Sequence, residues 1–172
     1  MYLSAKNHIL RAMNNLLIRP LQSETEAGFC AGFLAASEPW LTLGFSAEQV
    51  LQRLTDPTRE VHIATRDDQI IGTLVLHLAG PLNGYIQAIA VHPDWRGRGS
   101  GTILMRFAEE RIFRQSPNVF LCVSSFNHHA QQFYERLGYR RIGELENFLV
   151  AGHSEILLRK TSGPLLSFRQ GT

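Results

Sequence analysis

The chain carries little net charge and contains no long hydrophobic run. Its 172 residues include 17 lysines and arginines against 15 aspartates and glutamates, a formal net charge of +2. So small an excess does not favour a nucleic acid or a membrane surface as a partner. No stretch approaches the roughly 20 apolar residues of a membrane span. Lys6, His8 and Arg11 also interrupt the opening segment, where a secretory signal would be apolar. We therefore expect a soluble protein of the cytoplasm.

Cysteine is scarce too, which argues against a disulfide framework. The two cysteines, Cys30 and Cys122, lie far apart in apolar surroundings, so we expect two small buried thiols. The adjacent His128 and His129 have no third ligand at metal-binding spacing, and we interpret them as the start of a helix. The sequence therefore predicts no metal site.

Composition and length indicate one globular domain. Hydrophobic residues make up 44% of the chain and charged residues 19%, values typical of folded proteins. At about 150 residues per domain, the length favours a single domain. We place this domain at residues 17–160. It follows an N-terminal extension, residues 1–16, whose pattern is compatible with a helix, and it precedes a tail, residues 161–172, that is rich in turn residues.

Hydrophobic periodicity predicts the order of strands and helices. Runs rich in β-branched and apolar residues predict strands at 17–21, 60–65, 70–78, 85–91, 118–124, 139–145 and 154–159. Apolar residues at helical spacing predict helices that begin after Ser23, after Ser46, at Gly99 and after Asn127. The resulting order, βααβββαβαββ, is that of a mixed α/β domain.

The run from Ile89 to Thr102 joins an apolar strand to an amphipathic helix through a glycine-rich turn. Glycines let the backbone approach a ligand closely, and the start of a helix leaves N–H groups unpaired. These features predict an anion site that fits a phosphate, with Arg96 and Arg98 adding positive charge at its rim. A turn that serves only to reverse the chain is the structural alternative. The run fits neither a P-loop nor a dinucleotide-binding fingerprint.

Two motifs resemble the signatures of the GNAT superfamily of acyl-coenzyme A-dependent N-acetyltransferases. The first is Arg96-x-x-Gly99-x-Gly101, which follows Ala90-Val91-His92-Pro93, and the second runs from Asn127 to Tyr139. The element order is also similar from about Leu17 to Lys160. The resemblance implies a mixed, mostly antiparallel central sheet flanked by helices. It also implies acetyl-coenzyme A as co-substrate.

The resemblance further implies which residues hold coenzyme A. The pyrophosphate is expected on the turn formed by Arg96, Gly97, Arg98, Gly99, Ser100 and Gly101, with Thr102 beside it. The pantetheine arm is expected to pair with Ile89, Ala90 and Val91 like an added strand, which requires this strand to splay from segment 118–124. Asn127 matches a position that touches the arm, and it is equally suited to be the N-cap of the following helix.

Amine acylation needs a proton donor for the leaving thiolate and a group that deprotonates the amine. Tyr134 matches the tyrosine that donates a proton to the coenzyme A sulfur in the family, although it also fits the apolar face of a helix beside Phe133. The general base is not assigned, because Cys122 occupies the position at which some relatives carry a glutamate. Candidates for the base are His62, His77, Glu38 and Glu146, each of which could instead be a surface or structural residue. Proton removal through a chain of waters is a further route. His92, beside Pro93, is interpreted as a turn residue.

The acceptor is expected at the apolar loop that contains Glu38 and Trp40. Glu38 can pair with the cation of an amine and Trp40 can flank it, although Trp40 fits the core equally well. Gln87 can orient a water near the acetyl group, and segment 147–153 is expected to form another wall. The resemblance implies acetyl transfer to a primary amine of a small molecule, a peptide amino terminus or a lysine. A non-catalytic coenzyme A sensor or interaction module, and a nucleotide-binding protein without coenzyme A, are the alternatives. Association of two copies is left open.

Overall fold

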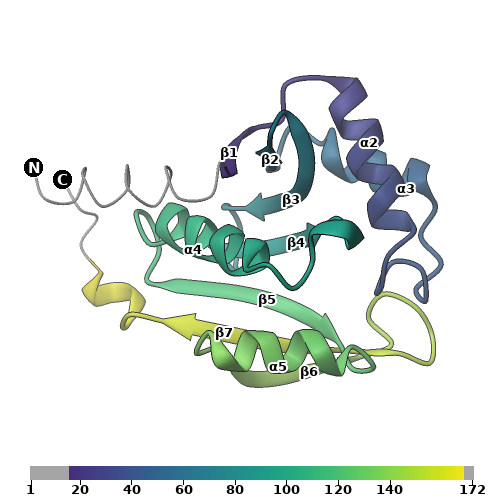
Figure 1. The fold of residues 1–172 in the computed structure, drawn as a ribbon. Helices are drawn as coiled ribbons and strands as arrows, with labels where there is room; N and C mark the ends of the chain where they lie inside the picture. Colours follow the sequence, from purple (N-terminus) through teal and green to yellow (C-terminus); the bar gives the residue numbers. More distant parts are fainter. Residues whose placement is uncertain (1–15, 169–172) are drawn as a thin grey trace, which may run out of the picture.

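The computed structural model describes residues 16–168 of the chain (Figure 1). In this range seven strands are formed: β1 (Leu16–Pro20), β2 (Glu60–Arg66), β3 (Gln69–His77), β4 (Tyr85–Val91), β5 (Asn118–Ser124), β6 (Arg140–Glu146) and β7 (Ser154–Thr161). The α-helices of the same range are α2 (Glu24–Ala35), α3 (Ala47–Leu54), α4 (Ser100–Ile112) and α5 (His128–Arg136). Short 3₁₀ turns are η1 (Pro93–Trp95) and η2 (Leu165–Ser167).

The seven strands of residues 16–168 form one sheet in the order β1-β2-β3-β4-β5-β7-β6. Neighbouring strands are antiparallel except for β4 and β5, which are parallel. A parallel pair needs a crossover connection, and α4 provides it. The expectation of a mixed α/β fold with a mostly antiparallel central sheet flanked by helices is confirmed.

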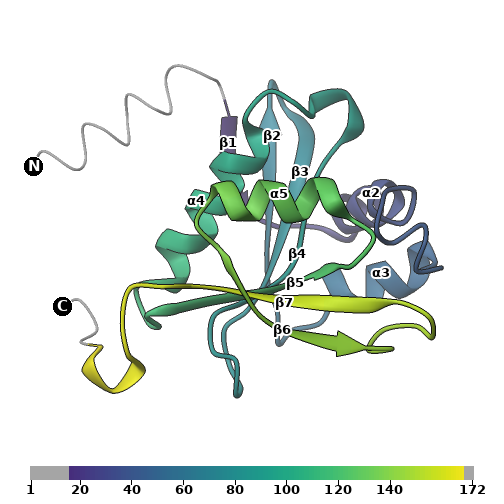
Figure 2. The same cartoon turned by 90° about the horizontal axis from the view of Figure 1, so that it is seen from below.

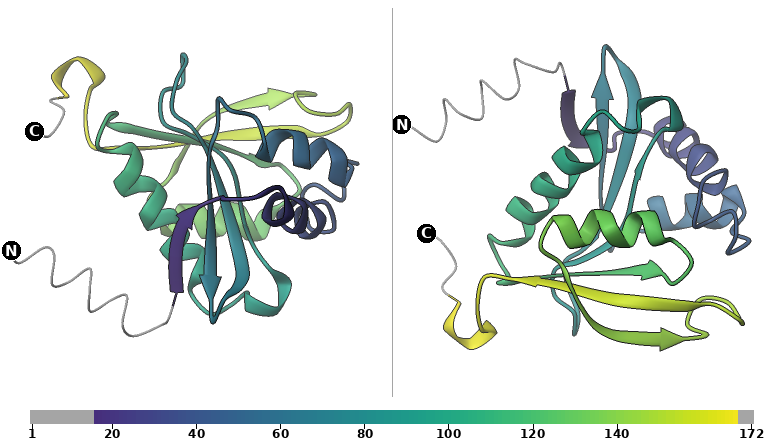
Figure 3. Two further views of the ribbon diagram at one scale, coloured as in Figure 1. Left: turned by 90° about the horizontal axis from the view of Figure 1, so that it is seen from above. Right: turned by 60° about the horizontal axis from the view of Figure 1, so that its bottom comes forward.

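The helices cover both faces of the sheet. Helices α4 and α5 lie on one face, where Leu104, Met105 and Tyr134 pack in a core cluster with residues of β5 and β7. Helices α2 and α3 lie on the other face, where Cys30, Leu34 and Val50 pack against β2 and β3. Figures 2 and 3 show these two layers on opposite sides of the sheet.

Local sequence signals explain where α2 and α3 begin. The Ser46 side chain accepts from Gln49 N, and the Gln49 side chain accepts from Ser46 N, a complete capping box. At Ser23 the box is half formed. The Ser23 hydroxyl accepts from Glu26 N, but the Glu26 carboxylate accepts from Gln22 N at 2.9 Å and pairs with Arg19 at 2.6 Å. The ion pair ties the start of α2 to β1.

Two expectations need correction or fall outside the described range. The helix expected near the N-terminus lies outside residues 16–168 except for its last residue, Leu16, which belongs to β1. Cys30 is buried as expected, but Cys122 is half-buried because it lines a cavity. Among the described helices, none is long and apolar enough to cross a membrane.

Candidate active site

Strands β4 and β5 form a fork. Within residues 16–168 their register is limited to Tyr85 opposite Phe120 and Ile86 opposite Leu121, although both strands continue for several residues. Figures 2 and 3 show the half of the sheet from β1 to β4 turned against the half formed by β5, β7 and β6. The splayed strand that a pantetheine arm requires is therefore present.

The closed end of the fork depends on Gly84. Its backbone has a φ of +93°, and its carbonyl accepts from Phe120 N at 3.0 Å. A Cβ at this position would meet the Asn118 carbonyl oxygen and lie 2.6 Å from Ile112 Cγ2. Only glycine therefore lets β4 and β5 approach here before they separate.

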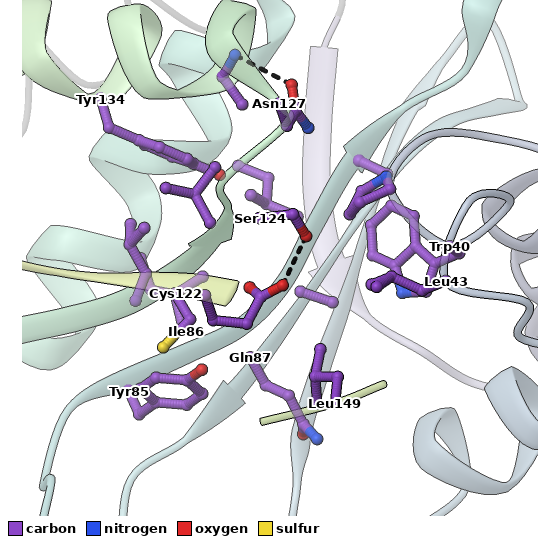
Figure 4. Close-up of a pocket in the computed structure, with 18 of the residues that line it drawn as sticks. Trp40, Leu43, Tyr85, Ile86, Gln87, Cys122, Ser124, Asn127, Tyr134 and Leu149 are labelled. Atoms are coloured by element: carbon purple, nitrogen blue, oxygen red, sulfur yellow. Dashed lines mark hydrogen bonds between the residues drawn. The ribbon is translucent and has the colours of Figure 1, made fainter. Parts of the chain in front are cut away.

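The fork opens into a cavity of about 990 Å³ (Figure 4). Most of the residues predicted for the site line it: Glu38, Trp40, Gln87, Ile89, Ala90, Val91, Arg96, Gly101, Asn127 and Tyr134. The remaining predicted residues, which do not line it, are Gly97, Arg98, Gly99, Ser100 and Thr102. This second set forms the turn before α4 and the first turn of α4, and it is separated from β4 by η1.

The turn before α4 has the backbone that an anion site needs. Gly97 and Gly99 adopt left-handed conformations with φ of +73° and +82°. Gly99 is the N-cap of α4, and no side chain of the described residues caps this helix start. The first N–H groups of α4 thus lack a side-chain acceptor, which leaves them suited to bind a phosphate. These residues fit the pyrophosphate of coenzyme A.

Arg96 is held by acceptors within the protein. Its Nε donates to the carbonyl oxygen of Val91 at 3.0 Å, and its Nη2 donates to Ser37 Oγ at 3.0 Å. Arg98 instead lies over the Trp95 ring, with its guanidinium carbon 5.1 Å from the ring centroid. The Arg96 side chain therefore braces the end of β4 against the end of α2, and its positive charge stays near the turn.

Tyr134 is both a core residue and a cavity-lining residue. Its ring centroid is 5.3 Å from that of Phe133 and 5.9 Å from that of Tyr139, and the side chain is 8% exposed. Burial raises the pKa of Tyr134 above its ordinary value. The phenol therefore keeps its proton at neutral pH, as a proton donor must, and its hydroxyl points toward the cavity in Figure 4.

Asn127 and His92 have clear structural roles. The Asn127 side chain accepts from Ala130 N at 3.2 Å and so caps α5, while Asn127 also lines the cavity. His92 Nδ1 accepts from Asp94 N at 3.4 Å, and its ring packs against Phe29 and Phe33. The interpretation of His92 as a turn residue agrees with these contacts.

The loop after α2 and the loop before β7 both contribute to the cavity wall. Glu38 accepts from Thr42 Oγ1 at 2.8 Å within the first loop, and Trp40 and Leu43 of the same loop point into the cavity. Trp40 also packs against the core cluster of α2 and α3, so it serves both roles that the sequence left open. Among the described residues, the buried Gln87 Oε1 has no hydrogen-bond partner.

The sequence did not point to Glu155, a buried carboxylate in this cavity. Glu155 is 4% exposed, and Ser124 Oγ donates to its Oε1 at 2.6 Å, the hydrogen bond drawn at Ser124 in Figure 4. Burial raises the pKa of Glu155, and the Ser124 hydroxyl opposes this rise. Its one sequence signal was an acidic residue directly before the apolar run Ile156–Leu158 in a predicted strand.

The base candidates named from the sequence are scattered. His77 and Glu38 line the cavity, whereas His62 and Glu146 do not. His62 packs against the Phe107 ring with a centroid distance of 4.8 Å, and burial lowers its pKa. Glu146 is exposed at the end of β6. Cys122 lines the cavity, and burial raises the pKa of its thiol.

Residues 19–139 match the sequence profile of the acetyltransferase (GNAT) family. The chain belongs to this family. It is 32% identical over 141 residues to S-(2-succino)cysteine N-acetyltransferase of Bacillus subtilis, a match that covers 74% of this chain and 84% of that protein. Membership makes the chain an acyl-coenzyme A-dependent N-acetyltransferase with acetyl-coenzyme A as co-substrate.

Solved GNAT structures share the fold at low sequence identity. An aminoglycoside 6'-N-acetyltransferase complexed with coenzyme A matches with a TM-score of 0.69 and 20% identity, covering 86% of this chain and 98% of that one. The ribosomal-protein-S18-alanine N-acetyltransferase of Escherichia coli matches with a TM-score of 0.70 and 15% identity, covering 87% and 95%. One fold therefore serves acetyltransferases named for a small molecule and for a protein.

Proposed function

We propose that this GNAT enzyme transfers an acetyl group from acetyl-coenzyme A to a primary amine of a small molecule, a peptide amino terminus or a lysine. The fork between β4 and β5, which opens beyond Ile86 and Leu121, is the observation that carries the proposal. The cavity at this fork is lined both by Gly101, near the start of α4, and by Tyr134 of α5. The relatives named for S-(2-succino)cysteine and for an alanine of ribosomal protein S18 support an amine acceptor.

In this proposal the turn holds the pyrophosphate and β4 holds the arm. The uncapped N–H groups at the start of α4 would bind the phosphate oxygens, beside Gly97 and Gly99. Ile89, Ala90 and Val91 line the fork and would pair with the amides of the arm. Acetyl-coenzyme A supplies the activated thioester carbonyl. The chain then has to orient the amine, exclude water and provide protons.

Tyr134 would give its proton to the departing sulfur. Its hydroxyl stays protonated because burial raises its pKa, and it reaches the cavity from α5. Gln87 would orient the acceptor or a water through its side-chain oxygen, which has no partner among the described residues. Glu38 and Trp40 would form the wall against which the acceptor lies.

Thiol release from acetyl-coenzyme A across a panel of primary amines tests the proposal. We expect release with at least one amine class and none without an amine. Acetyl-coenzyme A binding measured by calorimetry without thiol release from any amine would instead favour a sensor. Protection from heat by ATP but not by coenzyme A would favour a nucleotide-binding protein.

A pair of glycine variants tests the placement of coenzyme A. Gly99→Val puts a side chain at the helix start and strains a positive φ, so we expect at least a tenfold loss of coenzyme A affinity. Gly80→Val carries a comparable backbone strain, because Gly80 has a φ of +93°. Gly80 lies in the turn before β4, whereas Gly99 lies in the turn after it. We expect the coenzyme A affinity of Gly80→Val to be unchanged. Equal affinity of both variants and the parent would contradict the placement.

A further inference from the structure

We propose that Glu155 binds the ammonium group of the acceptor and takes its proton, and that the acceptor is a single amine on an apolar body. This rests on the proposed function of the same cavity. Glu155 is neither one of the base candidates that the sequence suggested nor part of a family motif quoted above. Its placement, its burial and the walls around it each support the role.

Strand geometry puts Glu155 on the acceptor side of the sheet. In the antiparallel pair of β5 and β7, Glu155 lies opposite Ser124 and Leu157 lies opposite Cys122. Ile156 and Leu158 pack into the cluster below α4 and α5. Since side chains alternate along a strand, Glu155 and Leu157 face the other way, and both line the cavity. Tyr134 lines the same cavity from α5, so a proton donor and a proton acceptor reach one cavity from different elements.

The Glu155 carboxylate is buried, and the basic side chain that lowers its pKa is His153. Among residues 16–168 no lysine or arginine pairs with it, and its hydrogen bond comes from Ser124. The titratable groups that affect it or respond to it are Tyr85 on β4, Cys122 on β5 and His153 before β7. A buried carboxylate that no lysine or arginine neutralises costs free energy. An ammonium group bound from the cavity would offset this cost.

The raised pKa of Glu155 suits a base. An ordinary carboxylate is too weak a base to take a proton from an ammonium group efficiently. A carboxyl pKa closer to neutral makes the carboxylate a stronger base. Burial moves the pKa of Glu155 in this direction. Glu38, the other carboxylate in the cavity wall, is exposed and bonded to Thr42 within its own loop.

The cavity walls select an apolar acceptor. The loops that line it contribute the apolar side chains of Trp40, Leu43, Phe45, Leu82, Phe148 and Leu149. The acidic side chains in the lining are Glu38 and Glu155, and the basic ones are Arg53, Arg96 and two histidines. A polyamine with several cations would need more carboxylates than this part of the chain offers. An acceptor with one ammonium group can pair that group with the Glu155 carboxylate. Its aliphatic or aromatic body can then pack against the apolar wall.

The proton balance of the transfer closes with these two residues. Glu155 takes one proton from the ammonium, the nitrogen forms its bond to the acetyl carbon, and the bond from that carbon to sulfur breaks. Tyr134 gives its proton to the sulfur. The second proton that the nitrogen loses replaces the one given by Tyr134, and Glu155 releases its proton to solvent. The products are an amide, a thiol and one proton.

Three variants test the role of Glu155. Glu155→Gln keeps the shape and an acceptor for Ser124 but cannot take a proton, so we expect kcat/KM for 2-phenylethylamine to fall about 100-fold or more. Acetyl-coenzyme A affinity should be unchanged by calorimetry. Glu146→Gln makes the same change on an exposed carboxylate of β6 and should behave as the parent. His77 is the histidine among the base candidates that lines the cavity. In His77→Asn, the acidic limb of the profile of kcat/KM against pH should stay where it is in the parent.

Ser124→Ala separates proton transfer from a structural role. The Ser124 hydroxyl stabilises the ionised carboxylate, so its loss should move the acidic limb of kcat/KM to higher pH. Carbon NMR of the Glu155 carboxyl in the enzyme without substrates should show the same upward shift, and a parent pKa above that of ordinary carboxyls. An ordinary pKa, or a limb that stays in place, would overturn the proposal.

The parent enzyme separates the two proposals. No thiol release from any amine would contradict the proposed function itself. Release in which Glu155→Gln matches the parent would overturn only the role of Glu155. Release with spermidine at a higher kcat/KM than with 2-phenylethylamine would overturn the apolar-acceptor class.

Discussion

Ile86 of β4 lies opposite Leu121 of β5, and beyond this pair the two parallel strands separate. The separation is what makes room for a ligand strand in a sheet that is otherwise continuously paired. The glycine before β4 keeps the closed end tight, and the crossover helix α4 begins directly beyond the open end. In the proposed complex, this one local feature of the backbone would provide both the arm site and its phosphate end.

Gly84→Ala should destabilise the protein at the closed end of the fork. Its new Cβ would meet the Asn118 carbonyl oxygen and Ile112, both held in the core, so we expect an overpacking cost of about 1–3 kcal/mol beyond backbone strain. Gly80→Ala shares the φ of +93° with nothing within 4 Å and gives the strain alone. Thermal unfolding should therefore place Gly84→Ala well below Gly80→Ala. Equal melting temperatures would contradict a tight closed end.

Tyr134→Phe should lower kcat by about 100-fold or more and leave acetyl-coenzyme A affinity unchanged. The variant keeps the packing against Phe133 but removes the proton that the sulfur needs. Tyr139→Phe is the matched control, because Tyr139 is buried in the same cluster and does not line the cavity. Steady-state kinetics and calorimetry measure both quantities. Parent-like kcat in Tyr134→Phe would remove its role as acid.

Ser37→Ala should loosen the turn before α4. It removes the acceptor of Arg96 Nη2, at a cost of about 1.5–3 kcal/mol, and also the hydrogen bond that Ser37 Oγ donates to the Phe33 carbonyl. We expect a lower melting temperature and a weaker affinity for coenzyme A, and saturating coenzyme A should recover part of the stability. Arg98→Ala, which loses only the stacking on Trp95, should affect the melting temperature less. The reverse order would show that Arg96 does not brace the turn.

Glu155→Gln should be more stable than the parent at pH 8. Because the pKa of Glu155 is raised in the folded state, the native protein holds a proton at pH values where the unfolded chain has lost it. The parent's free energy of unfolding therefore falls as pH rises from the unfolded value, about 4.3, through the folded one. Glutamine has no proton to lose.

Melting temperatures across this pH range measure the effect, at about 2–4 °C for each kcal/mol. The advantage of Glu155→Gln should shrink as the pH falls to about 4. Glu146→Gln should track the parent throughout. An advantage that is constant or grows toward low pH would contradict a raised pKa of Glu155.

The sequence predicted those parts of the site that depend on local backbone conformation. Gly97 and Gly99 adopt the left-handed conformations that a glycine turn before a helix implies, and Tyr134 lies where the second motif suggested. The start of α2 was also predicted, because Ser23 is a local N-cap signal and the helix begins at the next residue, Glu24.

Features that depend on pairing between distant strands could not be predicted. Glu155 faces the cavity only because β7 pairs with β5 in a register that places it opposite Ser124. A shift of one residue would turn its side chain to the other face. The bond of Arg96 to Ser37 likewise joins segments far apart in the sequence, so its role as a brace could not be predicted.

A crystal structure with bound coenzyme A tests the central claim most directly. The account predicts the pyrophosphate against the first N–H groups of α4, the arm beside Ile89 to Val91 in the fork, and the thiol next to the Tyr134 hydroxyl. Coenzyme A bound elsewhere, with no ligand between β4 and β5, would contradict it.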